Sequence, residues 1–400
     1  MTERVVITGA SVISPIGNSL EEFWKALETG RKGIGYIRDF SPEFYPSRLG
    51  AQVRNLESDS GDARTPDNKR IFFKRALREL LDRYPVVQTY QPSDRILNIG
   101  AGLDFFDLES YIDNSDRTNR SWRRYSLNTH QFIKDLADEC DIRGGVNVYV
   151  SACVASNHAL GQSYRMLKTG ENKIVISGGV DSMLNPLHYM GFYKLGALSD
   201  WRGNPQEACR PFDKKRCGLV LGEGAALFLL QKERLASPET ILAEIAGFGS
   251  TMDACSVTDP EPDGSSLAQA AVNAISDAGI APEDIDCVHL HGTGTPKDAP
   301  AEAHAMKRIF GQRFREIPVF SLKGQIGHLI AACGAVELLA AVYSLQTQTV
   351  PVTVNCVERD PEAPLNVVIG KSLSKKISCI LKLNTAFGGQ NAAFVVKKYG

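Results

Sequence analysis

A cysteine, two histidines, a lysine and a glutamate stand where side chains rarely serve packing alone. Cys153 follows the apolar run 148–150 and opens a helical pattern over 154–169. This places its thiol at a strand-to-helix corner, where free backbone N–H groups and the helix dipole favour a thiolate and can hold an oxyanion. Buried structural cysteines are common. The reading of Cys153 as a nucleophile therefore depends on what the rest of the chain supplies.

The other reactive side chains follow apolar strands and lie in glycine-containing turns or the helices after them. His291 opens the turn His-Gly-Thr-Gly-Thr-Pro, and Lys323 and His328 are five residues apart in a second loop. Each alone is also consistent with an ordinary turn histidine or a solvated loop lysine. Glu337 stands on an otherwise apolar helix, where an unpaired buried carboxylate would cost roughly several kcal/mol. We therefore expect Glu337 to pair with Lys323.

A late glycine turn is a further candidate. Phe387 is followed by two glycines between the last two strand patterns. This turn can bring backbone N–H groups and an aromatic ring to a site. A plain hairpin turn is the alternative.

Short apolar runs that end in glycine alternate with helical patterns along the chain. This alternation predicts an α/β fold whose central strands are buried on both faces. The expected strands centre on 5–9, 96–100, 174–179 and 288–292, and the expected helices span 20–29, 69–84, 154–169, 265–278, 302–310 and 334–346.

The organisation looks doubled. A strand-rich stretch over 219–231 closes a first half, residues 1–240, which carries the nucleophile. The second half, 241–400, carries the histidines, the lysine and the late turn. Residues 104–145 are polar and charged, which predicts an insertion on the surface or at a subunit contact.

The composition is that of a soluble globular protein. The chain has 400 residues, 43% hydrophobic and 23% charged, with a net charge of −1. The sequence contains no stripe of basic residues of the kind that would indicate a nucleic-acid partner. Nine cysteines, an odd number, argue against a disulfide framework and for a reducing compartment. The N-terminus lacks the pattern of a signal peptide, and the apolar stretch 329–345 is interrupted by Glu337 and is too short to span a bilayer. We expect a cytoplasmic protein with no membrane span.

The ordered set of motifs resembles one family across nearly the whole chain, the elongating β-ketoacyl-[acyl-carrier-protein] synthases of the thiolase superfamily. The resemblance implies a five-layer αβαβα fold with two duplicated halves. It implies decarboxylative Claisen condensation, with substrates carried on the phosphopantetheine of acyl carrier protein and with no metal or organic cofactor. It also implies a homodimer, or a heterodimer with a related subunit.

The resemblance assigns roles residue by residue. Cys153 is implied to accept the acyl group, and neutral His291 and His328 to donate hydrogen bonds to the enolate oxygen. Lys323, paired with Glu337, is implied to order the site. The remaining assignments are an oxyanion hole from the backbone N–H groups of Cys153 and Phe387, gating by Phe387, phosphopantetheine binding by Thr293 and Thr295, and carrier-protein docking by Lys69, Arg70, Lys74 and Arg75. A solvated helix face explains the last four residues equally well.

Some segments depart from the family pattern. The carboxylate of Asp298 is displaced by one position and is a candidate cap for a helix begun by Pro300. Ala386 replaces a glycine, which predicts a stiffer gate. The polar segment 123–130 stands where the family has an apolar acyl-pocket wall. These departures favour a specialised synthase.

Three other readings compete. A chain-length-type partner subunit would resemble the family but lack the nucleophile, whereas Cys153, His291, Lys323 and His328 are all present. A thiolase would carry a late Cys-x-Gly motif, and Cys379 has no glycine near it. A priming synthase would carry asparagine in place of His328.

Overall fold

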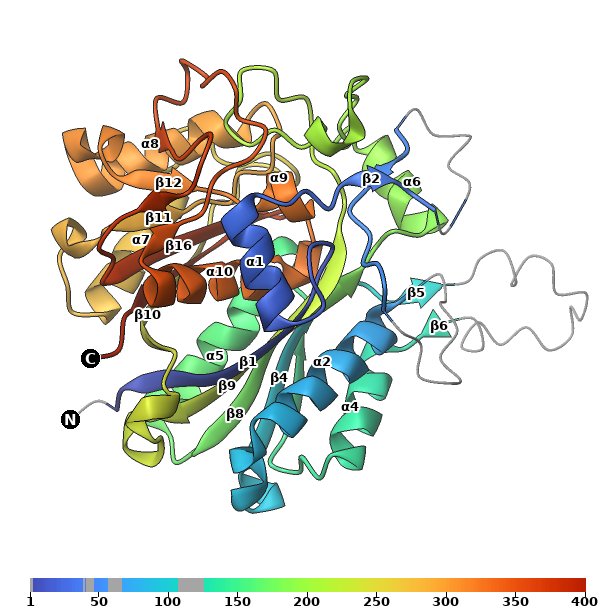
Figure 1. Cartoon of the computed structure of the whole chain (residues 1–400), viewed down its shortest axis with the longest axis vertical. Coiled ribbons are helices and arrows are strands. Elements are labelled where there is room, and N and C mark those ends of the chain that lie inside the picture. Colours follow the sequence, from blue (N-terminus) through green and yellow to red (C-terminus); the bar gives the residue numbers. More distant parts are fainter. Residues whose placement is uncertain (1–2, 39, 41–46, 57–66, 107–125) are drawn as a thin grey trace, which may run out of the picture.

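The computed structural model describes residues 3–38, 40, 47–56, 67–106 and 126–400. Within these residues one mixed sheet of 11 strands runs through the molecule (Figure 1), in the spatial order β14-β12-β11-β16-β17-β10-β1-β9-β8-β4-β7. Three small two-stranded sheets accompany it: β2 (Gly35–Tyr36) with β3 (Leu49–Gly50), β5 (Phe105–Phe106) with β6 (Ser126–Leu127), and β13 (Thr349–Val350) with β15 (Leu373–Ser374).

The large sheet contains the same strand order twice. The first run is β1 (Val5–Ile13), β4 (Arg95–Ala101), β7 (Val146–Tyr149), β8 (Ile174–Ser182) and β9 (Glu223–Lys232). The second run is β10 (Ala243–Met252), β11 (Cys287–His289), β12 (Pro318–Phe320), β16 (Cys379–Ala386) and β17 (Gln390–Lys397), with β14 (Asn366–Val367) beside β12.

In each run the spatial order is third, second, fourth, fifth, first strand. The two first strands, β1 and β10, pair antiparallel at the centre. The molecule is therefore built from two equivalent α/β units joined through their first strands.

Helices form three layers around the strands. α5 (Ala155–Thr169) and α10 (Cys333–Thr347) lie together in the middle and contact strands of both runs. α2 (Lys69–Arg83) and α4 (Thr129–Glu139) cover the outer face of the first run. α7 (Ser265–Asp277) and α8 (Asp298–Phe310) cover that of the second. α1 (Leu20–Thr29) packs against α10, and the short helices α6 (Pro186–Lys194) and α9 (Lys323–Ile326) complete the set. Strands covered on both faces explain the continuous apolar runs of the sequence.

One helical stretch is apolar and long enough to cross a membrane by composition. It spans Ile330–Thr347 with a mean hydropathy of 1.4, and 89% of it is buried inside the protein. Its apolar character is that of a core helix packed between the two halves of the sheet.

The expected helices are all present, with ends within two residues of prediction except at α8. That helix begins at Asp298, four residues before the predicted start. Pro300 lies in its first turn, where its missing N–H has no helical partner to lose.

The predicted insertion over 104–145 is wrong in its second part. Asn128 caps α4 by accepting a hydrogen bond from the N–H of Gln131 at 2.9 Å, and Phe132, Ile133 and Leu136 are buried in the core beside α2. The apolar face of α4 makes it part of the core rather than an excursion. Residues 107–125, which include the start of the predicted altered acyl-pocket wall over 123–130, lie outside the described residues.

Candidate active site

One cavity of about 290 Å³ gathers side chains from both halves of the chain. Its lining includes Cys153 from the first half and His291 and His328 from the second, together with Thr293, Thr295 and Phe387. Residues more than 200 positions apart in sequence therefore meet at one hollow, as the motifs predicted.

The nucleophile candidate lies on a strained turn. Ala152 has φ +47°, in the left-handed region that an alanine rarely adopts, and begins the 3₁₀ turn Ala152–Val154 that leads into α5. The turn reverses the chain after β7 and directs Cys153 into the cavity, although only 4% of Cys153 is exposed. The predicted strand-to-helix corner is present.

Burial favours the protonated form of the thiol. Burial raises the pKa of Cys153 to about 12, while the backbone N–H of Phe387 and the ammonium of Lys323 act in the opposite direction. The sequence predicted that the helix N-terminus would favour a thiolate. Desolvation is the larger effect here, because it disfavours the charged form throughout a buried site.

Two backbone N–H groups face the sulfur atom. Those of Phe387 and of Cys153 itself both interact with the thiol and lower its pKa. Phe387 lies in the turn between β16 and β17, where Gly388 and Gly389 have φ +81° and +78°. Its ring stacks on Phe192 of α6 with centroids 6.1 Å apart. Both N–H groups that were predicted to form an oxyanion hole therefore lie beside the thiol.

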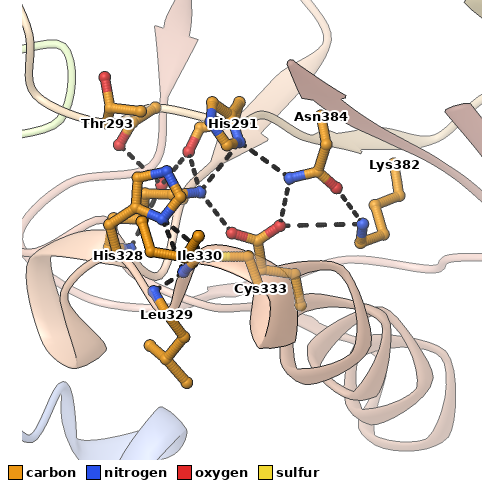
Figure 2. Close-up of polar contacts among 12 residues, drawn as sticks. His291, Thr293, His328, Leu329, Ile330, Cys333, Lys382 and Asn384 are labelled. Carbon is orange, nitrogen blue, oxygen red and sulfur yellow. Dashed lines mark hydrogen bonds and ion pairs between the residues drawn. The ribbon is translucent and has the colours of Figure 1, made fainter. Parts of the chain in front are cut away.

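His291 follows β11 and presents a defined tautomer. Its Nδ1 accepts from Nζ of Lys323 at 3.1 Å and from Nδ2 of Asn384 at 2.9 Å (Figure 2). Burial lowers the pKa of His291 well below its ordinary value, and the Lys323 ammonium lowers it further. A neutral ring whose Nδ1 is an acceptor must carry its proton on Nε2.

His328 is held as the same neutral tautomer, with its proton on Nε2, by other contacts. Its Nδ1 accepts from the backbone N–H of Ile330 at 3.1 Å, and Sγ of Cys333 lies 3.2 Å away (Figure 2). Burial lowers the pKa of His328 to about 3, with Lys323 acting in the same direction. The rings of His291 and His328 stand 5.2 Å apart at 84°. The cavity is thus lined by two neutral imidazoles that each keep an Nε2–H to donate.

The turn after His328 repeats the geometry before Cys153. Ile330 has φ +44° and begins the 3₁₀ turn Ile330–Ala332 that leads into α10. A β-branched residue in this region is strained, and such strain persists where the surrounding structure enforces it. The two strained turns, Ala152–Val154 and Ile330–Ala332, lie in contact with each other.

The predicted pairing of Lys323 with Glu337 is present. Nζ of Lys323 lies 2.5 Å from Oε1 of Glu337, and neither side chain is exposed. Burial alone would raise the pKa of Glu337, but Lys323 reverses this and, with Lys382, lowers it to about 2. Lys323 also donates to the backbone carbonyl of His291 at 2.6 Å. The ion pair therefore anchors one catalytic loop to the core helix α10.

The loop after His291 is held by two buried carboxylates of α8. Glu302 accepts from the N–H groups of His291 at 2.6 Å and Gly292 at 2.9 Å. Asp298 accepts from the N–H and hydroxyl of Thr293 at 2.8 and 3.0 Å, so its carboxylate serves this loop and does not cap α8 as predicted. The hydroxyl oxygens of Thr293 and Thr295 lie 2.9 Å apart at the cavity wall.

Two polar residues of the site were missed by the sequence analysis. Asn384 and Lys382 alternate with apolar residues on β16 and point toward Glu337 and His291 (Figure 2). The available signal was the same one that identified Glu337: a charged residue, Lys382, inside an otherwise apolar run.

The predicted docking cluster needs one correction. Lys69 is fully buried, 3.0 Å from the carboxylate of Asp67, and also bonds the carbonyl of Leu103. It stands three and four residues before the buried Phe72 and Phe73, on the same helix face. Arg70 and Arg75 are exposed and Lys74 is half-buried, so these three remain on the surface.

The arrangement of the cysteines and of the candidate metal ligands bears on whether the protein holds a disulfide or a metal ion. All nine cysteines are free in this structure. Across the described part of the chain, no group of three or more His, Cys, Asp or Glu side chains is arranged to hold a metal ion.

Comparison with known families covers most of the chain. The family model described as "Beta-ketoacyl synthase, N-terminal domain" matches residues 2–236, and the model described as "Beta-ketoacyl synthase, C-terminal domain" matches residues 242–357. Among curated proteins, 3-oxoacyl-[acyl-carrier-protein] synthase 2 of Synechocystis sp. is 32% identical over 409 residues, covering 99% of this chain and 98% of the relative. The protein of the same name from Coxiella burnetii is 31% identical over 407 residues, with the same coverage.

Solved structures of ketosynthases are similar to this chain over its whole length. A type II polyketide ketosynthase bound to its hexaketide and in complex with its acyl-carrier protein superposes with a TM-score of 0.90 at 25% identity, over 100% of both chains. The ishigamide ketosynthase/chain length factor gives 0.89 at 26% identity, again over 100% of both chains, and a β-ketoacyl synthase from Burkholderia phymatum gives 0.87 at 27% over 99% of both. The predicted five-layer thiolase-like fold with two like halves is confirmed.

Proposed function

The chain belongs to the β-ketoacyl synthase family, and on that premise we infer that it is an acyltransferase of the 3-oxoacyl-[acyl-carrier-protein] synthase type. Its reaction is the decarboxylative Claisen condensation of an enzyme-bound acyl group with a malonyl thioester. One observation carries the assignment of roles. Cys153 and two neutral imidazoles, each with Nδ1 occupied by a donor, line the same cavity.

The first half-reaction loads the acyl group. Sγ of Cys153 attacks the thioester carbonyl of acyl-carrier protein, and the N–H groups of Cys153 and Phe387 bind the oxyanion that forms. The carbon–sulfur bond to the carrier then breaks, and the proton lost by Cys153 goes to the departing carrier thiolate. The thiolate is the attacking form of Cys153. The proton that it gives up is the one that the carrier thiolate takes, so the exchange involves no net gain or loss of protons.

The second half-reaction forms the new carbon–carbon bond. Malonyl thioester loses CO2, and the enolate oxygen accepts hydrogen bonds from Nε2–H of His291 and His328. The enolate carbon attacks the acyl–Cys153 thioester, the tetrahedral intermediate uses the same oxyanion hole, and Cys153 leaves and takes up a proton. The reaction itself draws on no metal or organic cofactor, because decarboxylation generates the carbanion.

Thr293 and Thr295 are proposed to bind the phosphopantetheine arm. Both threonines line the cavity together with the exposed Lys297 and the two histidines. Asp298 fixes Thr293 in place. The partner that delivers the arm is proposed to be an acidic acyl carrier protein, with Arg70, Lys74 and Arg75 as candidate docking residues.

A homodimer is proposed through β7. This strand pairs with β4 alone among the described residues, so its other edge is open, and Val150 just beyond it is 60% exposed. Open edges of this kind are templates for strand pairing. Light scattering of the purified chain should give twice the monomer mass, and Val150→Arg should lower it. A chain that is monomeric alone and dimeric only with a related subunit would show a heterodimer instead.

The second candidate function is a chain-length-type subunit with little activity of its own. The similarity to the ishigamide ketosynthase/chain length factor is compatible with it. Cys153, His291 and His328 line one cavity and Lys323 is hydrogen-bonded to His291, which favours the active synthase. We propose a cytoplasmic enzyme of fatty-acid or polyketide-like biosynthesis, in a specialised pathway.

Two measurements test these roles. Intact-mass analysis with a panel of acyl-carrier proteins should show acyl transfer to the wild type and none to Cys153→Ala, and the panel also identifies the acyl group. A mass gain that persists in Cys153→Ala would exclude it as the nucleophile. CO2 release from malonyl-carrier protein should fall about 100-fold or more in His291→Ala and in His328→Ala. The surface variant His304→Ala is the control, and unchanged release in both site variants would refute the proposed roles.

A further inference from the structure

A second buried lysine lies behind the catalytic histidine. Lys382 of β16 is 1% exposed, and its Nζ donates to Oδ1 of Asn157 at 2.8 Å and to Oδ1 of Asn384. Nζ is also 3.8 Å from Oε2 of Glu337, whose other oxygen binds Lys323 (Figure 2). Two ammonium groups thus share one carboxylate in the core. Burying a second charge without a counter-charge of its own is costly.

Lys382 and Glu337 together determine which way the Asn384 amide faces. Nδ2 of Asn384 donates to Nδ1 of His291 at 2.9 Å and to Oε2 of Glu337 at 2.6 Å, while its Oδ1 accepts from Lys382. Turning this amide by half a turn would set its NH2 group against the ammonium of Lys382, donor against donor. An ammonium has no acceptor to offer, so only the observed orientation satisfies both groups.

The amide orientation in turn determines what His291 presents to substrate. An Asn384 NH2 group at Nδ1 requires the tautomer with the proton on Nε2. A reversed amide would offer its oxygen to Nδ1 and favour the other tautomer, against the Lys323 ammonium that also donates to Nδ1 at 3.1 Å. The lone pair of Nε2 would then face the enolate oxygen and repel the charge that develops there.

We propose that Lys382 is a positioning residue for the decarboxylation step, which holds the Asn384 amide and, through it, the His291 tautomer that donates to the enolate. The inference rests on the proposed condensing function and adds to it a residue that touches neither substrate nor nucleophile. The ammonium charge of Lys382 also lies beside the carboxylate of Glu337, where it adds positive potential close to the developing enolate.

The charge of Lys382 changes in an accessible pH range. Burial lowers the pKa of Lys382 to about 8; Glu337 opposes this shift and Lys323 adds to it. The other groups that face it hold their charge there: Glu337 stays ionised, Lys323 stays protonated because Glu337 raises its pKa, and the pKa values of His289 and Cys333 lie far below and far above this range. Decarboxylation should therefore weaken as pH rises through about 8.

The test compares two partial reactions in Lys382→Met and in a matched control, Lys232→Met. Lys232 is also a buried lysine on a central strand, bonded to the carbonyl of Gly170 away from the cavity. CO2 release from malonyl-carrier protein by Lys382→Met should fall about 10- to 100-fold, because a hydrogen bond from a charged group is lost. Acyl transfer to Cys153 should stay within about twofold, because the orientation of His291 does not enter that step. Lys232→Met should match wild type in both reactions.

A second variant works without removing Lys382. Nδ2 of Asn157 has no hydrogen-bond partner among the described residues, so Asn157→Asp removes no donor in use. A carboxylate beside Nζ favours the ammonium form and should move the alkaline fall of decarboxylation upward by about one pH unit or more. This variant tests the role of Lys382 in decarboxylation even if Lys382→Met does not fold.

The outcomes distinguish a failure of the proposed function from a failure of the role proposed for Lys382. A wild type that releases no CO2 would refute the proposed function. A wild type that releases CO2 beside a Lys382→Met variant with the same rate and pH profile would overturn the role of Lys382 alone, as would an Asn157→Asp profile that does not move.

Discussion

Replacing Glu337 by glutamine removes the only negative charge between two buried lysines while keeping the size of the side chain. Lys323 lies 2.5 Å from one carboxylate oxygen and Lys382 3.8 Å from the other, and all three side chains are buried. In Glu337→Gln the two ammonium groups face each other without a counter-charge. The glutamine NH2 group also meets Nδ2 of Asn384, which donates to that position at 2.6 Å.

The size of the effect follows from the burial of the pair. Breaking a fully buried ion pair by removing one partner costs about 3–5 kcal/mol. The unfolding entropy of about 2.1 cal/mol/K per residue gives about 0.8 kcal/mol/K for a chain of 400 residues. We therefore expect the melting temperature to fall by about 4–6 °C in scanning calorimetry at pH 7.

The effect should depend on pH in a defined direction. The pKa of Glu337 is about 2 in the folded protein, below the ordinary value of 4.5. Its contribution to stability is fully present above pH 4.5 and is lost as pH falls toward 2. The gap in melting temperature between wild type and Glu337→Gln should accordingly narrow over that interval.

Two further variants make the test decisive. Glu21→Gln breaks an ion pair of similar length, 2.6 Å to Arg83, but on the surface, and should cost less than about 1 kcal/mol. Adding Lys323→Met to Glu337→Gln removes one stranded ammonium, so the double variant should melt above Glu337→Gln alone. If the double variant instead melts lower, by the sum of the two single losses, the reasoning from a coupled buried pair is wrong.

Three other changes have expected outcomes. Gly100→Ala would place its Cβ 2.2 Å from the backbone nitrogen of Ser156, so chemical denaturation should show a loss of about 3 kcal/mol or more. Gly191→Ala, with nothing within 4 Å and a place inside α6, should gain about 0.5–1 kcal/mol in the same assay; a loss would contradict the open surroundings. Thr295→Val, which loses a hydroxyl at the cavity wall, should raise KM for carrier-bound substrate about 2- to 10-fold with kcat within about twofold in steady-state kinetics. A fall in kcat alone would place Thr295 in the chemical step.

The residues recovered from sequence share a recognisable setting. His291, Lys323 and His328 follow short apolar strands and lie in glycine-containing turns or, for Lys323, at the start of α9, so their polarity contrasts with that of the preceding strand. Cys153 stood out because it lies between a strand-like apolar run and a helical pattern. Five of the six expected helices were recovered within two residues, because their apolar faces repeat at helical spacing and several end at glycine or begin at a capping side chain. The helices α4, α6 and α9 were not predicted.

What the sequence did not reveal depends on tertiary contacts. Lys382 and Asn384 lie inside a strand, where alternation cannot show that one face meets the carboxylate of a distant helix. Lys69 was assigned to the surface for its charge, although its spacing to Phe72 and Phe73 already placed it on the buried face. The pKa of Cys153 was predicted in the wrong direction, because the depth of burial of a thiol is a property of the assembled core.

The two strained turns, one before Cys153 and one after His328, occupy equivalent places in the two halves, and they touch. In the proposed mechanism, one presents the atom that receives the acyl chain, and the other supplies the N–H that holds the imidazole assigned to decarboxylation. A substitution that relaxes either turn will move the other, since both are packed against the same neighbours. In the proposed mechanism this contact links loading to condensation: directed evolution for a new acyl group at Cys153 should alter the rate of malonyl turnover as well, and compensating mutations should arise in the opposite half of the chain.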